Sequence, residues 1–191
     1  MTLLNNMLWG TCNTVLDSDT CSENMDWFAS SLESQCATEV TQRNSFVLNT
    51  LDGLKLYGLS RQAGCQSNPD TNVYCYIQAA TQPDPSDLYF YQVQYGLSIP
   101  NNTNPSCSPC TKSLMGLYVS AISGQEELED ENLRSMLAQA YFHASRIAVN
   151  VCGNDFVETI AIDGSGSPRL SLSLSLLFSA LLIGCISVVI F

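Results

Sequence analysis

Apolar side chains recur at the three- and four-residue spacing of amphipathic helices in several stretches of the chain. The longest such pattern predicts a helix from about Glu127 to Val151. Acidic residues crowd its start, where the helix dipole favours negative charge. One face of this helix would carry Leu133, Leu137, Ala140, Tyr141, Ala144, Ala148 and Val151.

Further helices are predicted before it. Pro109 suits the first turn of a helix that ends at Gly124, and a short element follows Val73. The other patterns cover about residues 25–36 and 38–60, and a turn that Ser86 could cap covers 87–91. No strand pattern competes, so the predicted fold is a small all-α domain of four to five helices with long loops, braced by disulfides, plus a C-terminal hydrophobic helix.

The last stretch, Asp163–Phe191, has three parts in a fixed order. Small residues come first, then a short polar spacer, then an uncharged run from Leu170 to Phe191. This order is typical of a glycosylphosphatidylinositol (GPI) attachment signal, with Gly164 or Ser165 as the attachment residue. A transmembrane helix and a cytosolic tail anchor stay open as alternatives.

The sequence therefore divides into four parts. Residues 1–11 are interpreted as an N-terminal remnant, since Asn5 and Asn6 interrupt the apolar run that a signal peptide would need. Residues 12–152 form a cysteine-rich helical ectodomain, 153–169 a stem with the attachment region, and 170–191 the hydrophobic tail. A truncated gene start would explain the missing leader.

Eight cysteines precede the tail, and Cys185 lies within it. An even number in a chain with secretory features predicts four disulfides, for which 105 pairings are open. Asn101 begins an Asn-x-Thr glycosylation acceptor in a polar stretch. The eight cysteines are Cys12, Cys21, Cys36, Cys65, Cys75, Cys107, Cys110 and Cys152.

Charge excludes one class of function. The chain has 18 acidic and 7 basic residues and a formal net charge of −11, which repels phosphate backbones. Binding of nucleic acid is therefore not expected.

Candidate chemistry is sparse. Cys107 and Cys110 have the spacing of a dithiol redox site but lack its βαβ setting, so structural disulfides are favoured. The single histidine, His143, has no nucleophile elbow to support catalysis, and zinc would need thiolates that disulfides remove. Carboxylate pairs such as Asp84 with Asp87 are interpreted as turn and cap residues. No catalytic residue, metal site or cofactor is predicted.

The aromatic stretch from Leu88 to Tyr95 admits two interpretations. The favoured interpretation is a hydrophobic staple that covers the core. The alternative is an aromatic ledge that binds a ligand, because tyrosine combines an apolar ring with a hydrogen-bonding tip.

Three segments, Cys75–Ala79, Pro85–Tyr91 and Pro105–Leu114, resemble a domain of fungal secreted or surface proteins. The last contains Cys-x-x-Cys-Thr-Lys-Ser-Leu, the most specific part of a resemblance that covers about Cys12–Cys152. Proteins of that family combine a leader, the cysteine-rich domain and a Ser-rich stem with a hydrophobic tail. Their function is unknown, so the resemblance implies no catalytic residue.

The predicted function is that of a non-enzymatic, GPI-anchored cell-surface or cell-wall protein with a structural or interaction role. Its expected partners are the membrane, through the anchor, and cell-wall glycans or surface proteins. Two alternatives are a carrier of a small apolar ligand and, less favoured, a thiol-disulfide redox protein that uses Cys107 and Cys110.

Overall fold

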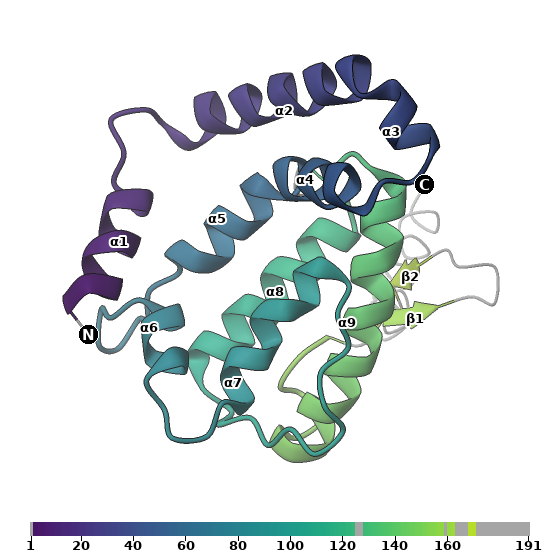
Figure 1. Cartoon of the computed structure of the whole chain (residues 1–191). Helices are drawn as coiled ribbons and strands as arrows, with labels where there is room; N and C mark the ends of the chain where they lie inside the picture. Colours follow the sequence, from purple (N-terminus) through teal and green to yellow (C-terminus); the bar gives the residue numbers. More distant parts are fainter. Residues whose placement is uncertain (1, 125–127, 159, 163–167, 171–191) are drawn as a thin grey trace, which may run out of the picture.

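The computed structural model describes residues 2–124, 128–158, 160–162 and 168–170. Within these residues the protein is a layered helical domain with one small antiparallel ribbon, so the predicted all-α class is confirmed (Figure 1). The elements are α1 (Thr2–Cys12), α2 (Ser18–Gln35), α3 (Ala37–Thr41), α4 (Ser45–Lys55), α5 (Tyr57–Cys65), α6 (Cys75–Ala80), α7 (Ser86–Tyr89), η1 (Phe90–Tyr95), α8 (Pro109–Ile122), α9 (Glu131–Cys152), β1 (Ile160–Ile162) and β2 (Pro168–Leu170).

The described chain has more helices than the four to five expected, because one predicted helix is interrupted and α1 is an additional one. The stretch 38–60 contains three helices rather than one. Arg43 has a positive φ of 55°, and Asn44 then caps α4 by accepting from the backbone N–H groups of Phe46 and Val47. Residues 2–11, expected to precede the domain, lie in α1, which packs on α5.

The core is built around the antiparallel pair α8 and α9 (Figure 1). Tyr118 and Tyr141 are its largest buried side chains. The Tyr118 hydroxyl donates to the carbonyl of Phe90 at 3.1 Å, and that of Tyr141 donates to the carbonyl of Glu158. Each buried hydroxyl is thus satisfied, and the two tyrosines fix η1 and the segment after α9 against the helix pair.

Gly96 fixes how closely η1 approaches α9. Its φ is +71°, and a Cβ there would collide with the side chain of Met136. Glycine is needed both for the left-handed backbone and for this close contact.

The first three helices form an outer layer with little apolar burial. Among their described side chains only Ala29 is buried, whereas Trp27 of α2 is 64% exposed. Figure 1 shows α2 lying along α4, away from α8 and α9.

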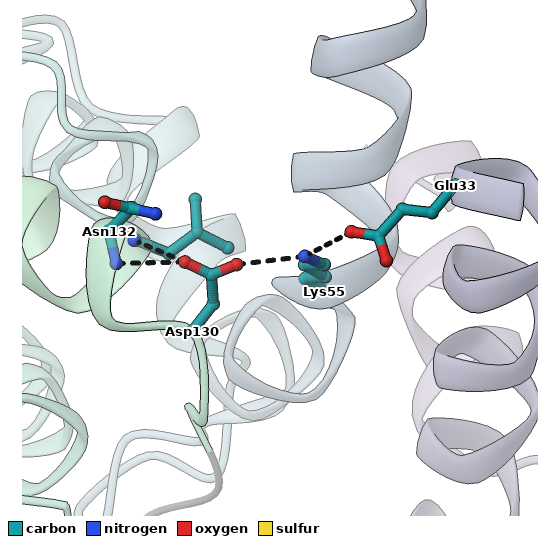
Figure 2. A network of polar contacts seen from close by, with 5 residues as sticks. Glu33, Lys55, Asp130 and Asn132 are labelled. Atoms are coloured by element: carbon teal, nitrogen blue, oxygen red, sulfur yellow. Dashed lines mark hydrogen bonds and ion pairs between the residues drawn. The ribbon is translucent and has the colours of Figure 1, made fainter. Parts of the chain in front are cut away.

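One polar network ties this outer layer to the core (Figure 2). The Lys55 ammonium group lies 2.8 Å from a Glu33 carboxylate oxygen and 2.9 Å from Asp130 Oδ2. Asp130 Oδ1 meanwhile caps α9 by accepting from the N–H groups of Asn132 and Leu133. One carboxylate therefore starts the main core helix and holds the lysine that reaches α2.

Three disulfides cross-link the domain: Cys12–Cys65, Cys75–Cys110 and Cys107–Cys152. The prediction of four is wrong, because Cys21 and Cys36 are unpaired. They lie at the two ends of α2, about 22 Å apart at 1.5 Å per residue. A disulfide needs Cα atoms within about 7 Å of each other, so these two cannot join.

Substitutions at Asp130 should separate its two roles. Asp130→Ala removes a cap and is expected to lower the free energy of unfolding by about 1–2 kcal/mol. Asp130→Asn keeps a capping oxygen and should lower it by about 0.5 kcal/mol. Urea denaturation measures both, with the exposed Glu23→Ala as control; equal losses for the two variants would contradict the capping role.

The network should also make stability depend on pH. Burial raises the pKa of Asp130, but the bonds from Lys55 and the backbone outweigh it and hold that pKa below its usual 3.8. The Asp130 stabilisation is therefore present above that pH and is lost as the pH falls through the lower folded pKa. Burial lowers the pKa of Lys55, but Glu33 and Asp130 outweigh it and raise that pKa above 10.5, so its stabilisation is lost as the pH rises through the higher folded value.

Wild type and Lys55→Met should accordingly differ most in unfolding free energy between about pH 5 and 9. The difference is expected to shrink towards both extremes, as measured by denaturant titrations at a series of pH values. A difference that stayed constant from pH 2 to 11 would show that the ion pairs contribute nothing.

Alkylation of the oxidised chain tests the cysteine assignment. Cys21 and Cys36 should be modified after denaturation without reductant, because only they are free among the cysteines of the described residues. The other six should react only after reduction, as peptide mass mapping would show. A linked peptide that contains Cys21 or Cys36 would refute the assignment.

Candidate functional site

An open hollow of about 380 Å³ is lined by residues of α1, α5, α6, α7 and η1. Neighbouring pairs of these elements are in contact, so α1 and η1, which are far apart in the sequence, belong to the same wall. We call it the tyrosine groove. Its lining residues are Leu8, Ser60, Gly64, Tyr76, Leu88, Tyr91, Gln92, Gln94 and Tyr95.

The aromatic stretch is divided between the core and this groove. Phe90 and Val93 are fully buried in the core, as expected of a hydrophobic staple. Tyr95 lines the groove, and Tyr91 belongs both to the core cluster and to the groove wall. Because η1 is a 3-10 helix with about three residues per turn, Phe90 and Val93 share its core face, and the residues between and after them lie on its other faces. The staple and the ledge are therefore different faces of one element.

Tyrosines form the apolar part of the wall. The rings of Tyr76 and Tyr91 pack edge to face, with centroids 5.0 Å apart and planes at 89°. Burial raises the pKa of Tyr91, with a further contribution from Asp87, so its hydroxyl is neutral at all physiological pH values. Tyr95 is 46% exposed, and its hydroxyl lies 3.5 Å from Ser60 Oγ at the rim.

Gln94 is a buried polar residue of the wall. It is 5% exposed, yet its Oε1 has no hydrogen-bond partner among the described residues. A buried acceptor without a partner costs about 1–3 kcal/mol, so such groups in native proteins are uncommon and usually meet water or a ligand.

Helix α1 closes one side of the groove through Leu8. The helix is held by the disulfide from Cys12 to Cys65, at the end of α5. Leu8 also lies beside Gly64, where an added Cβ would be 3.9 Å from Leu8 Cδ2, an ordinary van der Waals contact. Beside Leu8, the side chains of Met7 and Trp9 are 61% and 59% exposed.

A second hollow, of about 320 Å³, lies between α2 and the junction of α4 with α5. Its wall is more polar and includes Asp19, Asp26 and Lys55, but Lys55 already pairs with Glu33 and Asp130. Unlike the tyrosine groove, this hollow has no unpartnered buried polar atom in its described lining.

The Cys107-x-x-Cys110 segment does not form the dithiol of a redox site. Cys107 bonds to Cys152 and Cys110 to Cys75, so the two sulfurs belong to separate disulfides. Each sulfur already has a partner distant in sequence, so the alternative prediction of a thiol-disulfide redox protein that uses Cys107 and Cys110 is wrong.

Asp87, weighed in sequence only as one of a carboxylate pair, is a buried structural anchor for this segment. Its oxygens accept from the backbone N–H of Ser106 at 2.9 Å, from the Ser106 hydroxyl and from the Thr111 hydroxyl at 3.3 Å. The acceptor thus fixes the turn that carries Cys107. Asp84 accepts from the N–H of Ser86, as expected of a turn residue.

His143 and Asn101, considered separately in the sequence, are neighbours. The His143 Nε2 atom lies 2.9 Å from Asn101 Oδ1, and Asn101 itself is exposed. Thr103, the third residue of the glycosylation acceptor, is 5% exposed. The other ring nitrogen, Nδ1, has no hydrogen-bond partner among the described residues. Those residues also hold no cluster of three or more His, Cys, Asp or Glu placed to bind a metal.

The attachment residues Gly164 and Ser165 and the tail 171–191 lie outside the described residues. Among the helices that the structure describes, none combines the length and the hydrophobicity needed to cross a bilayer.

Three disulfides indicate an extracellular or secreted protein, because reducing compartments keep thiols free. No curated protein and no solved structure matches the chain. One family model does match, over residues 1–161, a span that contains both hollows and all three disulfides. The chain therefore belongs to the family described as Domain of unknown function (DUF7729).

Proposed function

We propose that this protein is a non-enzymatic, GPI-anchored protein of the cell surface or cell wall, with a structural or interaction role. The observation that carries the proposal is the set of three disulfides, which joins α1 to α5, α6 to α8 and α8 to the end of α9. Such bracing suits a domain that must persist outside the cell, where no chaperone refolds it. The resemblance to fungal surface proteins supports the same placement.

The surface features fit an interaction role at that location. Asn101 stands exposed for a glycan, and α2 and α4 present large apolar side chains such as Trp27 and Phe46. Apolar groups left exposed in this way are common where a protein meets a partner. The partners proposed are the membrane, through the anchor, and cell-wall glycans or surface proteins.

The tyrosine groove favours a second candidate, the carriage of a small apolar ligand. Its volume of about 380 Å³ lies within the range of about 300–1,000 Å³ that small-molecule pockets occupy. Its lining is dominated by tyrosine and leucine, as such pockets usually are.

Treatment of intact cells with a phosphatidylinositol-specific phospholipase tests the anchor. The enzyme should release the protein, and mass analysis should find its C-terminus at Gly164 or Ser165 with the remnant of the anchor attached. Substitution of both residues by tryptophan should abolish release, because the transamidase needs small side chains there. Protein that stays on the cells and retains Phe191 would instead support a spanning helix.

A further inference from the structure

We propose that the tyrosine groove binds a small, uncharged, mostly apolar molecule that carries one hydrogen-bond donor, such as a hydroxyl, and that Gln94 Oε1 accepts this donor. Such binding rests on the carrier role of the groove and adds the chemistry of the ligand and the residue that recognises it.

The case for a donor comes from Gln94. A glutamine that served packing alone could be a leucine of similar size, which would need no partner in the wall. Here the amide oxygen is buried and has no partner in the described chain, and Gln94 is one of the residues that line an open hollow. A ligand donor would satisfy the oxygen and remove the penalty of about 1–3 kcal/mol.

The case for an uncharged ligand comes from the rest of the wall. None of its nine lining residues is Asp, Glu, Lys or Arg. A charged molecule would lose its hydration without gaining an ion pair, which is strongly unfavourable. The net charge of −11 further disfavours anions.

The size and shape of the groove argue for a small molecule rather than a protein. A hollow of about 380 Å³ holds a molecule of modest size, whereas a stable protein interface buries about 800 Å² on each partner. The edge-to-face pair of Tyr76 and Tyr91 offers a rigid apolar surface within it. At the rim, Tyr95 and Ser60 place hydroxyls where the ligand would meet water.

Photolabelling of the oxidised full chain tests this assignment. The probe is a benzyl alcohol that carries a trifluoromethyl-diazirine, and its methyl ether is the matched analogue without a donor. After irradiation, mass mapping should place the alcohol on peptides that contain Leu8, Tyr76 or Leu88–Tyr95. The alcohol should label these peptides about fivefold more than the ether at equal concentration, as one net hydrogen bond predicts.

Two variants assign the effect. Gln94→Leu should keep groove labelling but bring the ratio of alcohol to ether down to about one, since the acceptor is gone. Ser60→Trp should fill the groove and abolish labelling there by both probes. Phe46→Ser, at a side chain that is 80% exposed on α4 and does not line the groove, should leave the wild-type pattern unchanged. Thermal unfolding of each variant, compared with wild type, confirms that it is folded.

Two results would overturn the assignment, and the second would also exclude the carrier role. Equal labelling of the wild-type groove by alcohol and ether would remove the role of Gln94 while leaving a carrier groove. Labelling confined to exposed aromatic residues such as Trp27, unaffected by Ser60→Trp, would remove the carrier role as well. Neither result bears on the anchor, which phospholipase release tests separately.

Discussion

The start of α8 is the point on which the rest of the structure depends. Within four residues, Cys107 and Cys110 send disulfides in two directions, to the end of α9 and to the start of α6. Each closes a loop of 35 to 45 residues, which in the chain-entropy model stabilises the fold by about 4 kcal/mol. The buried carboxylate of Asp87 fixes the turn between them.

Fastening α8 at this point aligns it with α9, and the largest buried side chains, Tyr118 and Tyr141, then fill the space around the pair. Each hydroxyl donates a hydrogen bond to a backbone carbonyl, because a buried O–H must find an acceptor. One holds η1 and the other holds the segment that follows α9. The tight part of the domain thus runs from α5 onward, and the helices before it are attached to it.

That attachment explains where the tyrosine groove lies. Helices α1 to α3 bury little apolar surface, so they are held by a disulfide at Cys12, by Lys55 with its two carboxylates, and by contacts of α2 with α4. Helix α1 packs on α5, and its Leu8 lines the groove together with residues of α5, α6 and η1. The other face of η1 is locked into the core, so its tyrosines are held in place before any ligand arrives.

The sequence by itself determined the helical class, the course of α8 and α9, the position of Pro109 in the first turn of α8, the stop at Gly124 and the cysteine-rich character. These features follow from local spacing and backbone preference. It could not reveal that Arg43 breaks a long apolar pattern, since a single residue in the left-handed region leaves no mark on hydrophobic periodicity. Nor could it pair the cysteines: Cys107 and Cys110 looked like one site, yet their partners lie 45 and 35 residues away and are chosen by three-dimensional proximity. For the groove, the aromatic stretch was visible in the sequence, but the acceptor Gln94 was not. Whether a polar atom is buried without a partner depends on packing, which only the tertiary structure decides.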